Sequence, residues 1–416
     1  MSSQLNLLCR EYSGFVNALK KQAEKFTEIN PDIKIEIKTI EEYERLNEEM
    51  IKSSLTSNYD IFLCLTDIVP QLLKNRSLVP LNKYIKEDPP EDWPNTYDKA
   101  LLRIQTDKDG YIYGFPYHDG PVMFYYRKDL FEEKKNKEEF KRKYGKALKP
   151  PKTWSEFLNI AQFFTKREEG FYGAVVGAKP DGHNNIYDFM INLWTRGGSF
   201  FDDKMKPIFN SKEGVEALQF YSDLIRKYRV VPEESVKFSA IDAGEFYYKE
   251  GKASMTWNWT HVAAMAEIPK YSSIVGKTGY SLIPKGDLKG QHISLSVYWI
   301  LGITSGSKNK DEAYKFLRFV TKHEMDKITA YEGNIATRLS VWREPEILKR
   351  WPFYSMIEKI HKNVGNLPPI PEYPEINKVL NEAIEEVVIE GKDVKETLDK
   401  AREEVYKIME RAGYYG

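Results

Sequence analysis

Two tryptophans with one asparagine between them stand in the segment "MTWNWTH" at residues 255–261. Side chains alternate between the two faces of a β-strand, so Trp257 and Trp259 are predicted to share a face and Asn258 to lie on the other. An indole ring offers a flat apolar surface and one N–H donor. Such a pair suits either a hydrophobic core that buries both rings or a cleft in which at least one ring contacts a ligand.

The sequence does not contain the motifs of the common catalytic and metal sites. None of its six histidines stands in HExxH or another metal-ligand spacing, and neither GxSxG nor GxGxxG occurs. The segment "VGKTG" contains Gly-Lys-Thr, but Tyr271 stands where a phosphate-binding loop needs its first glycine. We therefore expect no metal, no cofactor and no enzymatic activity. A glycoside-active enzyme stays an alternative, because its paired carboxylates would come from distant loops.

Length and charge narrow the class of protein further. A chain of 416 residues exceeds what one hydrophobic core usually serves, so two domains are expected. Lys+Arg and Asp+Glu both number 62, and this balance gives no field that would favour nucleic acid. Charged residues make up 30% of the chain, with only seven glutamines and two cysteines, a composition typical of a thermophile.

The two cysteines, Cys9 and Cys64, lie near the ends of the apolar runs "LNLLC" and "YDIFLCL". Free cysteine behaves as a small hydrophobic residue, which favours two buried thiols in core strands. A disulfide between neighbouring strands is the alternative, since an exported protein would permit it.

The first hundred residues alternate between strand and helix periodicity. The runs "LNLLCRE", "DIKIEIKTI" and "YDIFLCLTD" read as strands, and helical segments separate them. This order predicts a parallel sheet with helical crossovers, in which ligands bind beyond the carboxyl ends of the strands. The residues predicted at that edge are Glu11, Tyr12, Ser13 and Asp67. For Asp67 the alternative is an N-cap of the following helix.

The α/β alternation continues after residue 115. The Lys/Glu-rich stretch at 132–149 is interpreted as the solvated face of a helix. A further helix is predicted to begin after Thr153, which forms a capping-box pattern with Glu156. Trp154, directly after the capping threonine, is predicted to pack in a core.

Seven segments of the chain, each a weak signal alone, follow one another in a recognisable order. They are "YDIFLCLTDIVPQLLKNRSLVPLNKYI", "GYIYGFPYHDGPVMFYYRKDLF", "PKTWSEFLNIAQFFTK", "EGKASMTWNWTHVAAM", "GYSLIPKG", "ISLSVYWILGITSGSKNKDEAYKFLRFVTKHE" and "GNIATRLSVW". Through these motifs the chain resembles, nearly end to end, a known family, the solute-binding proteins of ABC importers in the maltose and multiple-sugar class.

The resemblance implies an α/β fold of the two-lobed periplasmic-binding-protein (Venus-flytrap) type, each lobe a mainly parallel sheet flanked by helices. We expect an N-terminal lobe of residues 1–118 and 285–331 and a C-terminal lobe of residues 119–284 and 332–416. Three hinge crossings are placed near Tyr117–Gly120, Ser281–Pro284 and Tyr331–Ile335. Ligand would stabilise a closed form by touching both lobes.

The same resemblance implies further ligand-binding residues. The loop at Trp257, Asn258 and Trp259 is one that the family directs at ligand. Tyr298 and Trp299 lie at the return crossing. As neighbours in a strand they face opposite sides, so one of them is expected to face the cleft. Trp194, which ends a helix before Gly197 and Gly198, is a further candidate for ligand contact. His118 and Asp119 interrupt the first crossing, where they would bind ligand hydroxyls or form a solvated turn.

The implied function is binding of a carbohydrate, an oligosaccharide above all, in the interlobe cleft and its delivery to the membrane permease of an ABC importer. A peptide or another polar solute is the alternative ligand, because a fold does not determine its ligand. We expect a monomer outside the cytoplasm, tethered at the cell surface or in the periplasm. The chain shows no signal peptide or lipid-attachment cysteine, so this localisation assumes that a leader has been removed.

Overall fold

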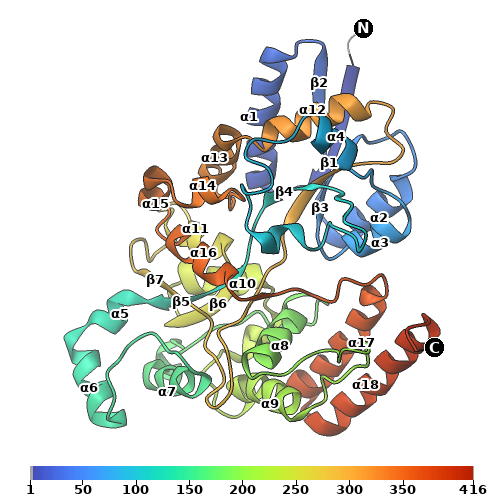
Figure 1. Cartoon of the computed structure of the whole chain (residues 1–416). Coiled ribbons are helices and arrows are strands. Elements are labelled where there is room, and N and C mark those ends of the chain that lie inside the picture. The colour runs from blue at the N-terminus through green and yellow to red at the C-terminus, as the bar shows by residue number, and fades with distance from the viewer. Residues whose placement is uncertain (1–2, 416) are drawn as a thin grey trace. The chain divides into compact units, whose positions relative to one another are not determined.

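The computed structural model describes residues 3–415 and contains two compact units. Unit 1 comprises residues Met1–Pro121, Ser296–His361 and Asn366–Pro371, and unit 2 comprises Val122–Leu295, Lys362–Gly365 and Glu372–Gly416. Both units mix helices and strands (Figure 1).

Unit 1 is built on one five-stranded sheet in the order β2-β1-β3-β9-β4. Strands β1, β2 and β3 run parallel, and β9 runs antiparallel to both of its neighbours. The elements of this unit are β1 Ser3–Arg10, α1 Ser13–Ile29, β2 Ile33–Ile40, α2 Tyr43–Ser53, β3 Ile61–Leu65, α3 Val69–Lys74, α4 Asn82–Glu87, η1 Lys99–Leu102, β4 Phe115–His118, β9 Trp299–Ile303, α12 Lys310–Val320, α13 His323–Tyr331, α14 Leu339–Trp342, α15 Pro345–Arg350 and α16 Tyr354–His361.

The central strands β1 and β3 are buried on both faces over residues 7–9 and 61–64, and these residues are all apolar, as expected for parallel strands covered on both sides. Helix α1 packs on α12 through Phe26, whose ring lies 5.2 Å from that of Phe316. Cys9 and Cys64 are free buried thiols, which confirms the favoured reading of the sequence. Burial raises the pKa of each thiol to about 12, so both stay protonated.

Unit 2 contains a three-stranded sheet, β6-β5-β7, and a short pair, β10-β8. Its elements are β5 Val122–Arg127, α5 Lys128–Glu132, α6 Lys134–Tyr144, α7 Trp154–Phe164, η2 Arg167–Glu169, α8 Asn184–Thr195, α9 Lys212–Arg226, η3 Glu233–Lys237, α10 Ala240–Tyr248, β6 Met255–Trp259, α11 His261–Ala266, β7 Thr278–Ser281, β8 Ser294–Leu295, β10 Val364–Gly365, α17 Tyr373–Glu385, the π-helical turn η4 Glu386–Glu390 and α18 Val394–Arg411.

The direction of the strands in unit 2 differs from the expected mainly parallel sheet. Both β6 and β7 pair antiparallel with β5. Helices separate these strands along the chain, and this is the pattern that predicted parallel pairing. Local periodicity identifies strands and helices, but the path of the connections decides which way each strand enters the sheet.

Two helix predictions in unit 2 are confirmed. Helix α6 is exposed along its charged residues and buries only Phe140 among its side chains. Helix α7 begins after Thr153, whose hydroxyl accepts a hydrogen bond from the Glu156 amide at 3.3 Å. Trp154 is buried, as predicted for a core residue.

The unit boundaries differ from the predicted lobes. Residues 332–361, expected in the second lobe, belong to unit 1, and residues 285–295, expected in the first, belong to unit 2. The chain changes unit after Pro121, Leu295, His361, Gly365 and Pro371.

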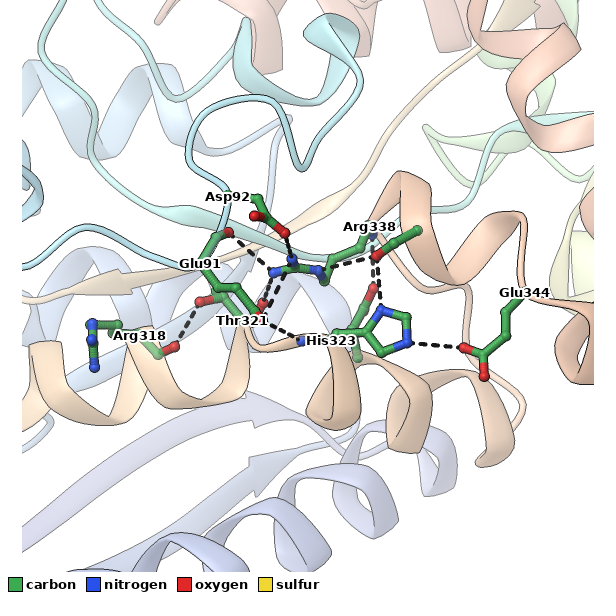
Figure 2. A network of polar contacts seen from close by, with 9 residues as sticks. Glu91, Asp92, Arg318, Thr321, His323, Arg338 and Glu344 are labelled. Atoms are coloured by element: carbon green, nitrogen blue, oxygen red, sulfur yellow. Dashed lines mark hydrogen bonds and ion pairs between the residues drawn. The ribbon is translucent and has the colours of Figure 1, made fainter.

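A buried arginine explains why the 332–361 segment stays in unit 1. The guanidinium of Arg338 donates to the Thr321 carbonyl at 2.7 Å and to the Asp92 carboxylate at 3.0 Å (Figure 2). The backbone amide of Arg338 donates to Asp326 of α13 at 2.8 Å. A buried guanidinium is costly unless its donors are paired, so these contacts hold the segment on unit 1. In residues 285–295, by contrast, Gly286 donates to Thr195 of α8 at 2.7 Å, a contact within unit 2.

Candidate ligand-binding site

In unit 1, four strand ends meet at one edge of the five-stranded sheet. Strands β1 and β3 end there at Arg10 and Leu65, and β9, which is antiparallel, begins there with Trp299 opposite Leu65. Strand β4 ends there with His118 opposite Trp299. The predicted residues Glu11, Tyr12, Ser13 and Asp67 follow directly after β1 and β3, so the topology brings them to the same edge.

Aromatic side chains at this edge form a tight cluster around Phe15, a residue of α1. The ring of Phe15 lies 5.1 Å from Tyr12, 5.1 Å from His118 and 4.9 Å from Trp299, each time in an edge-to-face arrangement. Aromatic pairs favour this geometry because the positive ring edge meets the negative ring face. The cluster therefore holds Tyr12, His118 and Trp299 in defined orientations.

The carboxylate of Asp67 is tied to the aromatic cluster through Tyr43. The Tyr43 hydroxyl donates a hydrogen bond to Asp67, and the Tyr43 ring lies 6.4 Å from that of Trp299. Asp67 also lines a small pocket of unit 1 together with Thr66, Ser296 and Asn366. The edge thus combines a carboxylate with flat apolar rings.

Sequence reasoning missed Phe15 and Tyr43. Tyr43 follows the carboxyl end of β2 by three residues, which is the same positional signal that identified Glu11, Tyr12 and Ser13. Glu11 and Ser13 are exposed, whereas Tyr12, Tyr43, Asp67 and His118 are half-buried. The Nδ1 atom of His118 accepts from the Ile335 amide at 3.0 Å, which orients the imidazole ring.

In unit 2, both tryptophans of "MTWNWTH" face helix α8. The Trp257 indole donates to Asp188 at 2.6 Å, and the Trp259 indole donates to Asn184 at 3.0 Å. Asn184 and Asp188 are one helical turn apart on α8, so the two rings share a face of β6 as the strand period requires.

Trp257 is a core residue. It is 2% exposed, and its ring lies 5.3 Å from Trp154 and 5.6 Å from Phe157, both in edge-to-face contacts. The expectation that it faces a ligand is corrected, because α7 and Asp188 cover the ring completely. Trp259 is half-buried and makes an edge-to-face contact with Tyr187 at 5.6 Å, so it stays a candidate.

Asn258, on the other face of β6, has a structural role. Its amide donates to the Ala240 carbonyl at 2.8 Å, and its side-chain oxygen accepts from the Trp259 amide at 2.7 Å. Both polar groups are therefore used in fixing β6, and the residue is 5% exposed. We remove Asn258 from the candidate site.

Two further predicted site residues, Tyr298 and Asp119, are buried in unit 1. The Tyr298 hydroxyl donates to Gln105 at 2.7 Å and accepts from the Ile104 amide at 3.2 Å, so the residue packs in the core. Asp119 is 0% exposed, and one of its carboxylate oxygens accepts from His361 at 2.7 Å. Both predictions are corrected, because Tyr298 packs inside unit 1 and the buried Asp119 carboxylate forms a pair with His361.

Trp194 is half-buried in the last turn of α8. Its ring packs against the backbone at Gly365, where an added Cβ atom would come within 2.6 Å of the ring. The remaining candidates are thus the edge residues of unit 1, with Trp259 and Trp194 in unit 2.

The match to a family model identifies the class of protein. Residues 12–327 match the model described as "Bacterial extracellular solute-binding protein". The chain belongs to this family of extracellular solute-binding proteins, and it is a solute-binding protein of the ABC transporter type rather than an enzyme.

Two curated relatives are similar to most of this chain. The mannitol-binding protein of Pseudomonas aeruginosa is 22% identical over 73% of this chain and 71% of its own length. A protein of Sinorhizobium fredii, described as a probable amino-acid ABC transporter periplasmic-binding protein, is 23% identical over 76% of this chain and 69% of its own length.

Among solved structures, maltose-bound MalE3 of Thermotoga maritima superposes with a TM-score of 0.83 at 23% identity, covering 97% of this chain and 99% of that one. A ribitol-bound solute-binding protein from Agrobacterium radiobacter gives a TM-score of 0.83 at 24% identity, covering 97% and 98%. These similarities establish the periplasmic-binding-protein fold. Within residues 3–415, no helix combines the length and the apolar character that crossing a membrane requires.

Proposed function

We propose that this solute-binding protein binds a carbohydrate and delivers it to the membrane permease of an ABC importer. The observation that carries the proposal is the combination, at one sheet edge of unit 1, of fixed aromatic rings with the Asp67 carboxylate. A sugar or sugar alcohol has apolar C–H surfaces that stack on aromatic rings and hydroxyl groups that donate to carboxylates.

Within this proposal, Trp299 and Tyr12 supply apolar ring surface, and Asp67 and His118 supply hydrogen-bonding groups. Trp299 is 7% exposed, so little of its ring surface is open to a ligand in this structure. In unit 2, the indole of Trp259 is half-buried, and its N–H already donates to Asn184. Trp259 would therefore contact a sugar through the face of its ring. Glu11, Ser13 and Trp194 are proposed as secondary contacts.

The ligands named for related structures support a polyhydroxylated solute. Those ligands are maltose, ribitol and D-mannitol. The Sinorhizobium fredii relative favours an amino acid as the second candidate ligand.

A thermal-shift screen followed by calorimetry tests the proposal. The panel holds maltose, longer malto-oligosaccharides, mannitol, ribitol and tagatose, with glutamate, leucine and a dipeptide as the competing class. A ligand at 100 times its Kd adds about 2.7 kcal/mol to the free energy of unfolding, which is a measurable rise in Tm. Stabilisation by amino acids alone would refute the carbohydrate proposal. Chromatography of the recovered ligand should show no product, and turnover would instead support the glycoside-active alternative.

Delivery to the permease needs a separate measurement. ATP-dependent uptake of the identified solute should be lost when the gene is deleted in its host and should return when the gene is restored. Uptake that is unchanged by the deletion would show that the protein binds the solute but does not deliver it to a permease.

A further inference from the structure

A turn at residues 181–184 presents Asn184 to the Trp259 indole. One carboxylate oxygen of Asp181 accepts from the backbone amides of His183 at 2.9 Å and Asn184 at 3.1 Å. The other accepts from the Asn184 side-chain amide at 3.2 Å. With its nitrogen held in this way, the Asn184 side chain directs its oxygen at the Trp259 Nε1 atom, 3.0 Å away.

Two asparagines of helix α17 form hydrogen bonds to this turn. The side-chain oxygen of Asn381 accepts from the Gly182 amide at 2.9 Å and from the Asn185 side-chain amide, also at 2.9 Å. The side-chain amide of Asn377, one turn earlier on α17, donates to the Gly182 carbonyl. Both polar backbone groups of Gly182 are thus bound by asparagines of a single helix.

Gly182 itself is suited to this arrangement. Its φ of +72° lies in the left-handed region, which glycine adopts without strain. An added Cβ atom would also lie 3.3 Å from the Asn377 side-chain nitrogen. The turn can therefore approach α17 closely enough for the three hydrogen bonds to form.

We propose that Asn377 and Asn381 are positioning residues that fix the Trp259 ring for ligand stacking. They act through the 181–184 turn and Asn184, and neither contacts the ring directly. The ligand part of this inference rests on the proposed function. Its physical basis is that a stacking ring binds well only when it is already held in the bound orientation.

Fluorine NMR of the ligand-free protein labelled with 5-fluorotryptophan tests the positioning. Trp259→Phe assigns the Trp259 resonance, and Trp257→Phe assigns the core reference. We expect Asn377→Ala and Asn381→Ala to shift or broaden the Trp259 resonance and to leave the Trp257 resonance in place. Asn381→Asp retains an oxygen acceptor for both hydrogen bonds and should restore the wild-type resonance. Asn58→Ala, an exposed asparagine of unit 1, is the matched control.

Calorimetry with the carbohydrate found in the screen tests the consequence. Asn377→Ala should bind about five- to tenfold more weakly, the loss expected from one hydrogen bond, and Asn381→Ala, which loses two, should bind at least as weakly. Asn381→Asp should bind within about twofold of wild type. A Trp259 resonance unchanged in both alanine variants would overturn the proposal. So would wild-type affinity alongside a shifted resonance. If no carbohydrate binds the wild-type protein, the proposed function fails, while the fluorine spectra still decide the positioning.

Discussion

The indole nitrogen of Trp257 lies 2.6 Å from a carboxylate oxygen of Asp188, inside the core of unit 2. The Tyr221 hydroxyl donates to the other oxygen at 3.0 Å. Burial raises the pKa of Asp188 to about 8, and the two hydrogen bonds only partly offset this effect. The acid is therefore mostly protonated in the folded protein at neutral pH.

The raised pKa of Asp188 predicts that unit 2 loses stability as pH rises. The unfolded chain releases this proton near pH 3.8 and the folded chain near pH 8, so the contribution is complete below about pH 4 and is lost as pH approaches 8. Asp188→Asn, a neutral mimic of the acid, should remove up to about 1.4 kcal/mol per pH unit of this slope. Urea unfolding at pH 5, 6, 7 and 8 measures it, with Asp203→Asn as the exposed control. Parallel pH dependences in wild type and Asp188→Asn would show that the group is ionised in the core.

The buried pair of His361 and Asp119 predicts a second pH effect, in unit 1. Burial alone would lower the pKa of His361, but the Asp119 carboxylate at 2.7 Å and the nearby Asp98 raise it above 6.5. A histidine with a raised pKa stabilises the fold fully below the unfolded value, near pH 6.5, and this stabilisation is lost at higher pH. Proton NMR should show one histidine, absent in His361→Gln, that titrates above 6.5. A His361 resonance that titrates below 6.5 would contradict the prediction.

The two tryptophans of β6 should respond oppositely to replacement. Trp257→Ala removes a fully packed ring from between Trp154 and Asp188, and it should cost about 3–5 kcal/mol in the free energy of unfolding. Trp259→Ala removes a half-buried ring and should cost less stability while weakening carbohydrate binding at least tenfold, about 1.4 kcal/mol. Chemical unfolding and calorimetry on both variants measure the two effects. Equal loss of stability with unchanged affinity in Trp259→Ala would make it a core residue as well.

Removing the Tyr43 hydroxyl should weaken ligand binding, although Tyr43 is proposed only to orient Asp67. Tyr43→Phe removes one hydrogen bond that orients the Asp67 carboxylate and should raise the Kd about three- to tenfold, and Asp67→Ala should raise it further. Tyr84→Phe is the matched control, because Tyr84 donates to Asp311 at 3.0 Å on the exposed surface of the same unit. Calorimetry measures the Kd of each variant. Equal Kd values in Tyr43→Phe and Tyr84→Phe would show that Asp67 does not contribute to ligand binding.

Local patterns in the sequence predicted strands β1, β2 and β3 of unit 1 and helices α6 and α7 of unit 2, because such patterns depend on residues close together in the chain. The alternation of strand and helix periods placed Glu11, Tyr12, Ser13 and Asp67 after β1 and β3, where the structure has them. The strand period also put Trp257 and Trp259 on one face, and both indoles do point at α8. The thiols of Cys9 and Cys64 are buried, as their mainly apolar neighbours in sequence predicted.

What covers each side chain was decided only by the tertiary structure. Trp257 and Trp259 are equivalent in local pattern, yet Trp154 and Phe157 of the distant helix α7 bury one and not the other. Asp119 follows a strand as a binding residue would, but it is buried, and His361, far along the chain, bonds one of its carboxylate oxygens. The antiparallel entry of β6 and β7 and the return of 332–361 to unit 1 likewise depend on contacts between segments distant in sequence. A local period carries no information about such partners, since burial is a property of the assembled core.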